Sequence, residues 1–216
     1  MRLEKDVVMT SDEGSQLLTD SLDWDRTHDV VSTPDKIFLT DSRLNASGTG
    51  LTGHPNLKSA QILEDVTVHF NTDAAKMAKD EKPVVADPSK VVTITCDGPM
   101  TVDQSQSMAI FEKNVVAIQV DRTLKADHLE VHFDQKASQI KEMICLGNVQ
   151  ILQGDNQTFA DKAVYTGVDQ RLTLTGHPKV IMITDGMKKM GKDKDEKEIT
   201  PKETTPEETP GAIIGN

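Results

Sequence analysis

Three stretches of this chain align without gaps, and the alignment indicates a repeated β-hairpin. They read TDSLDW at 19–24, ADHLEV at 126–131 and ADKAVY at 160–165. Each places a small residue and an aspartate before apolar side chains at alternate positions, which in a strand share one face. Each is followed by a polar turn and a second strand-like run, so the repeated unit is a hairpin of about 25–35 residues.

The tetrapeptide TGHP occurs twice, at 52–55 and at 175–178. Both copies follow a run of strand-forming residues, where Gly ends a strand and Pro prevents its simple continuation. We interpret them as equivalent turns that close a returning strand. On this interpretation His54 and His177 belong to turns and have no catalytic role.

Strand signals also dominate the remaining sequence, because β-branched residues are enriched in strands. The runs are KIFLTDSRL, AQILEDVTVHF, KVVTITC, PMTV and NVVAIQV. In the last of these the register is open, since either Val115 with Ala117 or Val116 with Ile118 could face the interior. The one helix-like run, 71–82, ends at a proline and is interpreted as a connector.

A single hairpin cannot bury its apolar face, so neighbouring hairpins must stack around a shared interior. The sequence therefore predicts an all-β fold, an elongated β-roll or folded-over sheet with two free ends. Free end strands favour pairing with a second copy or with a partner. We divide the chain into β segments at 1–70 and 91–186, a polar linker at 71–90, and a charged, Pro- and Thr-rich tail at 187–216 that we expect to be disordered.

Composition excludes several functions. The 24 Lys and Arg against 35 Asp and Glu argue against nucleic-acid binding, which requires clustered positive charge. A glycan-cleaving jellyroll enzyme needs paired carboxylates in an aromatic-lined cleft, and aromatic residues make up only 3% of the chain. No nucleotide loop can be argued from the GTG at 48–50, which lacks a strand–Gly–helix context. We expect no enzymatic activity and no cofactor.

Two groups of side chains are of residue types that can form a disulfide or bind a metal ion. Cys96 and Cys145 have no metal-binding spacing, and whether they form a disulfide is left open. His128, Glu130 and His132 share one strand face, a pattern that can bind Zn²⁺. That face is opposite the apolar one, so we assign it to solvent and expect no metal site.

The second half of the chain resembles the OstA-like domain of periplasmic lipopolysaccharide-transport proteins of the LptA type. The resemblance runs through PMTVDQSQSMAIFEKNVVAIQVDRTLKADHLEVHFD, CLGNVQILQGDNQTFADKAVY and LTLTGHPKV, and covers 99–182 almost throughout. The first half is similar to the LptC type, through LLTDSLDWDRTHDVVSTPDKIFLTDSRLNASGTGL and QILEDVTVHF. One departure is EKN at 112–114, where the family's usual Gly-Asn has lost its turn glycine.

The resemblance implies a β-jellyroll or β-taco whose apolar groove carries the acyl chains of lipid A. It also implies a periplasmic location, end-to-end stacking into a bridge between the inner and outer membranes, and other jellyroll components of the export machinery as partners. The family's export signal or membrane anchor is not present in this chain, and whether upstream sequence is missing is left open. The groove residues that we predict are Met100, Val102, Leu129, Val131, Phe133, Val149, Ile151, Tyr165, Leu172 and Leu174.

An alternative function is a structural or adhesive β-solenoid that binds protein partners through its end strands. In that case the same apolar residues are ordinary packed core. The two functions differ in whether the interior can open to admit a lipid.

Overall fold

The computed structural model describes residues 1–11, 14–41, 44–54, 58–71, 91–134 and 140–183. Within these ranges the regular secondary structure consists of strands alone, which confirms the all-β prediction. The strands are β1 (Arg2–Thr10), β2 (Gln16–Asp25), β3 (Val30–Thr40), β4 (Leu44–His54), β5 (Ser59–Asn71), β6 (Val91–Cys96), β7 (Met100–Asp103), β8 (Met108–Gln119), β9 (Arg122–Phe133), β10 (Ile140–Gln153), β11 (Asn156–Thr166), β12 (Arg171–Thr175) and β13 (Lys179–Ile181).

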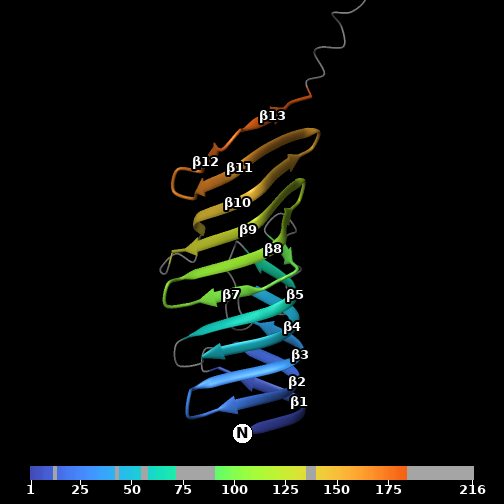
Figure 1. The fold of residues 1–216 in the computed structure, drawn as a ribbon, viewed down its shortest axis with the longest axis vertical. Coiled ribbons are helices and arrows are strands. Elements are labelled where there is room, and N and C mark those ends of the chain that lie inside the picture. The colour runs from blue at the N-terminus through green and yellow to red at the C-terminus, as the bar shows by residue number, and fades with distance from the viewer. Residues whose placement is uncertain (12–13, 42–43, 55–57, 72–90, 135–139, 184–216) are drawn as a thin grey trace, which may run out of the picture. The chain divides into compact units, whose positions relative to one another are not determined.

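All thirteen strands belong to one antiparallel sheet, and they follow one another through it in chain order (Figure 1). At two positions in the sheet, a pair of short strands takes the place of one long strand. Between β5 and β8, β7 pairs with residues 59–62 of β5 and β6 pairs with residues 66–71. In the same way, β12 and β13 both pair with β11. The two β segments of the sequence thus share one sheet, joined through the pairing of β5 with β6 and β7.

The long strands are interrupted near their middle by a bulge. The register shifts between Glu4 and Val7 in β1, between Glu112 and Val115 in β8, and between Leu146 and Val149 in β10. The skipped residues adopt a positive φ, which most L-residues avoid. They are Lys5, Asp6, Lys113, Asn114, Gly147 and Asn148. Because a bulge bends its strand, these positions form a column of bends along the sheet.

Burial shows that the sheet folds over at these bends. Leu22, Ile37, Val66 and Leu129 are no more than 1% exposed, yet within the described residues no helix or second sheet covers them. The halves of the sheet on either side of the bends must therefore cover each other. We call them wall 1, which ends at the turns 26–29, 104–107 and 167–170, and wall 2, which ends at the turns 120–121 and 154–155. The space between them is the trough, and its opening between the two lines of turns is the mouth.

The two TGHP copies are not equivalent, so that interpretation was wrong. His54 is the last residue of β4 and pairs with Ser59 across a hairpin end. Gly176 and His177 instead lie between β12 and β13, in the column of bends, with φ of 73° and 50°. Their structural counterpart is the break between β6 and β7, at Gly98 and Pro99.

The structure also answers smaller questions. In β8 the side chain of Val115 faces the interior and is 1% exposed, whereas Ile118 is 45% exposed on the outer face. Cys96 and Cys145 are buried and not bonded to each other. Strand β3 continues through Pro34, although the sequence suggested two shorter runs, and the register with β4 shifts there. The expected linker lies outside the described residues apart from Asn71 and the expected tail lies outside them entirely.

Candidate functional site

The trough is lined by rows of apolar residues that lie opposite one another on successive strands. The row of wall 1 nearer to the mouth crosses nine strand pairs without a polar interruption. Its members are Trp24, Val31, Gly53, Ala60, Val102, Ala109, Val131, Met143, Tyr165 and Leu172. Directly opposite residues contact each other across a strand pair, so the row is a continuous apolar surface.

A second row of wall 1 lies deeper, next to the bends. Its members are Thr33, Leu51, Ile62, Met100, Phe111, Leu129, Cys145, Ala163 and Leu174. Thr33 is the one polar member, and its hydroxyl lies 3.3 Å from that of Thr19. Most of this row is fully buried.

Wall 2 carries a comparable row. Its members are Met9, Leu17, Leu39, Ala46, Val68, Ile94, Ala117, Leu124 and Ile151. The row runs from β1 to β10 and therefore spans both β segments of the chain. The trough thus has a largely apolar lining along most of the sheet, with Thr19 and Thr33 as its buried polar pair.

Eight of the ten predicted groove residues lie in these rows, and Phe133 and Val149 lie beside them. Met100, Leu129, Val131 and Val149 are fully buried in the core, and Val102, Phe133, Ile151 and Leu174 are half-buried against it. Tyr165 and Leu172 pair with each other on β11 and β12, where the sheet ends, and Leu172 is 47% exposed. The structure thus brings the ten residues to the trough or its end, while lipid contact itself stays a prediction.

Sequence reasoning missed the half of the trough that β1–β6 contribute. Ile37, Leu51, Val66 and Val68 are each at most 5% exposed. The alternation in AQILEDVTVHF carried the signal, since Val66, Val68 and Phe70 recur at every second position. It is broken at Asp65, whose φ of 52° marks the bend.

The outer face of β9 is polar, as predicted. His128, Glu130 and His132 are half-buried there, and the Nε2 of His132 lies 2.5 Å from a carboxylate oxygen of Glu130. Among the residues that the structure describes, no group of three or more His, Cys, Asp or Glu is arranged to hold a metal ion. The same described residues include no helix that is long and apolar enough to cross a membrane.

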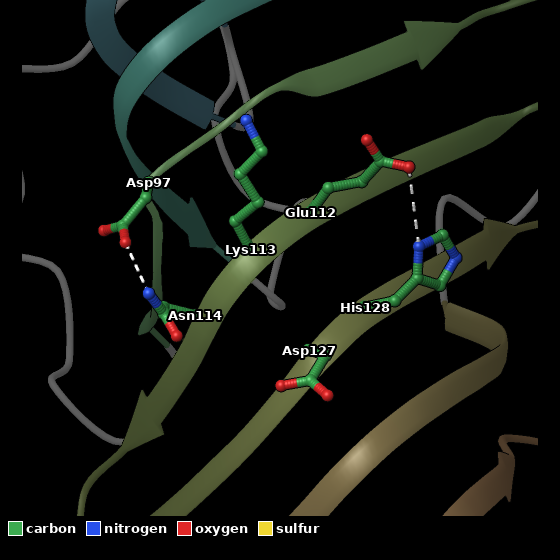
Figure 2. Close-up of a pocket in the computed structure, with 6 residues that line it drawn as sticks. All are labelled: Asp97, Glu112, Lys113, Asn114, Asp127 and His128. Atoms are coloured by element: carbon green, nitrogen blue, oxygen red, sulfur yellow. Dashed lines mark hydrogen bonds and ion pairs between the residues drawn. The ribbon is translucent and has the colours of Figure 1, made fainter.

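A shallow polar hollow lies on the outside of the bends of β8 and β9 (Figure 2). The side-chain amide of Asn114 donates a hydrogen bond of 2.6 Å to Asp97, and Nδ1 of His128 lies 3.8 Å from Glu112. Lys113 and Asp127 complete the lining, which thus holds three carboxylates and one lysine. These contacts join neighbouring strands, and we assign the hollow a structural role.

The two cysteines of the chain lie in apolar, buried surroundings. Cys145 pairs with Leu129 and Ala163 in the deep row of wall 1, and burial raises the pKa of its thiol to about 11. Burial also raises the pKa of Cys96. Such thiols stay protonated and behave as small apolar groups. These two residues therefore add apolar surface to the interior and offer no ionised nucleophile.

Comparison with known proteins gives family matches over two stretches of the chain. Residues 93–197 match the family model described as "LptA/(LptD N-terminal domain) LPS transport protein". Residues 1–71 match the model described as "Lipopolysaccharide-assembly, LptC-related". One similar solved structure is that of LptH from Pseudomonas aeruginosa, described as the LptA homologous periplasmic component of the conserved lipopolysaccharide transport device; the identity is 10%, over 80% of this chain and 97% of that chain, with a TM-score of 0.38. A search of curated proteins found no match.

Proposed function

This chain belongs to the OstA-like lipopolysaccharide-transport family, with an LptC-related first segment and an LptA-like second segment, and we propose that it shields lipid A acyl chains in its trough. We place the protein in the periplasm, as part of a bridge between the inner and outer membranes. It acts by binding and not by catalysis, and it needs no cofactor.

The observation that carries this proposal is the continuity of the apolar rows. An acyl chain leaves water at a gain of about 0.8 kcal/mol for each CH₂ that becomes buried. The row of wall 1 nearer to the mouth and the row of wall 2 have no polar member and offer similar contacts at every strand, so an acyl chain can move along them without a deep trap. Because the wall 2 row spans β1 to β10, this path joins the two family segments.

Site-specific photo-crosslinking tests the proposal. A photoreactive residue at Val102, Val131 or Tyr165 is expected to capture purified lipopolysaccharide, and one at Glu130 is not. Val131 and Glu130 are neighbours in β9 but point to opposite faces of the sheet. Equal capture at Glu130 and Val131 contradicts a path through the interior, and circular dichroism of each variant checks that the fold is intact.

The proposed partners are other jellyroll components of the export machinery and further copies of this chain. Among the described residues, β1 pairs only with β2, and β12 and β13 pair only with β11, so each end of the described sheet has an unpaired edge. Exposed apolar side chains accompany the C-terminal edge, including Leu172, Val180 and Ile181. Sedimentation velocity over a concentration series is expected to show self-association, and a strictly monomeric profile without binding to a jellyroll partner contradicts this assembly.

The packing of the interior supports the second candidate, a closed scaffold that binds protein through these edges. Ile37, Leu129 and Val149 are at most 2% exposed, so in this conformation the chain's own side chains fill the trough. The photo-crosslinking experiment separates the two functions. Capture of lipid at Val131 supports the conduit, whereas a folded protein that captures none at any of the three positions supports the scaffold.

A further inference from the structure

Two phenylalanines from opposite sides of the mouth contact each other. The ring centroids of Phe70 and Phe133 lie 5.5 Å apart, with an angle of 46° between the ring planes. Both rings are half-buried. This separation and tilt fall in the range in which aromatic pairs attract beyond simple area burial.

Strand order places the two residues on different walls. Phe70 is next to the last residue of β5, on wall 2, where it pairs with Leu44 and Val92. Phe133 is the last residue of β9, on wall 1, where it pairs with Ile140. Between β5 and β9 lie the row of β6 and β7 and strand β8, so along the sheet the strands are three spacings apart, about 14 Å. The rings therefore meet across the mouth and not within one wall.

The alternation along each strand confirms that both side chains point inward. Phe70 follows the buried Val66 and Val68 at every second position of β5. Phe133 follows the buried Leu129 and Val131 in the same way on β9. Both are the outermost inward-facing residues of their strands, so their contact closes the trough at the point where it opens to solvent.

Resting on the proposed function, we infer that Phe70 and Phe133 form a gate that an amphiphile must part to pass along the trough. A lipid with its acyl chains inside and its polar head in water occupies the mouth at each position along its path. At the Phe70–Phe133 contact the mouth is occupied by the two rings. The rings must separate before the head can pass, and they close again behind it.

The position of the gate gives it control over transfer between the two segments. Phe70 is the last residue but one of the LptC-related match at 1–71, and Phe133 lies in the LptA-like match at 93–197. A lipid that enters beside β1–β4 reaches the wall formed by β10–β12 only by passing this contact. The gate therefore separates the two halves of the trough.

A reversible tether tests the gate. Phe70→Cys and Phe133→Cys are combined with Cys96→Ala and Cys145→Ala, and the new thiols are joined by a short bismaleimide with a cleavable disulfide. The control tether joins Lys125→Cys to Gln150→Cys, which lie opposite each other on β9 and β10 and do not span the mouth. The probe is fluorescently labelled rough lipopolysaccharide, supplied as micelles, and the readout is its uptake rate.

We expect the tether across the mouth to slow uptake at least ten-fold and its reductive cleavage to restore the rate, while the control tether has no effect. The double variant Phe70→Ala/Phe133→Ala is expected to take up lipid several-fold faster. Phe38→Ala is its matched control, because Phe38 is 57% exposed on the outer face of β3. Circular dichroism checks the fold of each protein.

The outcomes separate the gate from the proposed function. If wild-type protein takes up lipopolysaccharide and the tethered protein does so at the same rate, the gate is wrong and the proposed function stands. An unchanged rate in the double alanine variant also overturns the gate. If no protein, wild type included, takes up the probe, the proposed function fails and the gate fails with it.

Discussion

The side-chain amide of Asn148 donates a hydrogen bond of 2.8 Å to the carboxylate of Asp127 where β10 and β9 bend together. The same relationship recurs at the neighbouring bends. Asn114 donates to Asp97 at 2.6 Å, and Nδ1 of His177 lies 3.1 Å from Asp161. The aspartates of ADHLEV and ADKAVY thus belong to a ladder of polar contacts that accompanies the bends.

Gly147→Ala is expected to destabilise the protein by about 2 kcal/mol, since a left-handed backbone costs an L-residue about 1–2 kcal/mol. Gly147 has a φ of 73°, and an added Cβ would lie 2.4 Å from a carboxylate oxygen of Asp127. The alanine must therefore also displace the partner of Asn148. Urea denaturation measures the free energy of unfolding. Gly154→Ala is the control, because its φ is 55° but no atom lies within 4 Å of the new Cβ; an equal loss at both positions would show that the aspartate contact is irrelevant.

Lys113→Gly is expected to stabilise the protein, by up to about 1 kcal/mol. Lys113 occupies the bend of β8 with a φ of 65°, at the place that Gly147 fills in β10. Glycine removes the left-handed penalty, although part of this gain is offset by its greater freedom in the unfolded chain. Thermal and urea unfolding measure the change. Lys125→Gly, at an extended position of β9, is the control and should destabilise.

The sequence was informative about strands and about the inward face, because alternation is a local property. Leu129, Val131 and Phe133 were assigned correctly to the interior from their own strand alone. The lost turn glycine at EKN also corresponds to a real feature, since Lys113 and Asn114 both have positive φ.

The sequence could not give the bends or the contact across the mouth. In β9, Ala126 and Leu129 are both buried, and this three-residue step breaks the period of two because the strand bends between them. The two TGHP copies have identical sequences but different structures, because the same tetrapeptide can lie at the end of a hairpin or at a bend between two short strands. The meeting of Phe70 with Phe133 depends on how two walls approach, which no single strand encodes.

Cys145 is expected to react with a thiol reagent at pH 8 at least about 100-fold more slowly in the folded protein than after unfolding, because the thiolate is the reactive form. Burial raises the pKa of Cys145 from 9.0 to about 11. The folded state therefore holds its proton more tightly, so its contribution to stability is present below pH 9 and is lost as the pH rises toward 11. Reaction with Ellman's reagent measures the rate in a Cys96→Ala background. Leu172→Cys, in a protein without native cysteines, should react quickly, and rapid labelling of native Cys145 would contradict a closed trough.

Val131→Asp is expected to destabilise the protein by about 3 kcal/mol or more at pH 7.5, because an ionised carboxylate without a partner is costly in an apolar interior. Val131 is 3% exposed and lies between Ala109 and Met143 in its row. Thr123→Asp adds the same charge to the outer face of β9 and should cost under about 1 kcal/mol.

The pH dependence of this loss identifies its cause. Burial raises the pKa of the introduced carboxyl in the folded state, whereas in the unfolded chain it stays near about 3.9. The folded state then binds the proton more tightly, so the loss relative to wild type is smallest near pH 4 and grows by up to about 1.4 kcal/mol for each pH unit above it. Urea denaturation of both proteins at pH 4.5 and 7.5 measures the difference. A loss that is the same at both values would mean that the shape of the new side chain, and not its charge, disturbs the trough; a loss that grows with pH places position 131 in a dry apolar interior of the kind that acyl chains require.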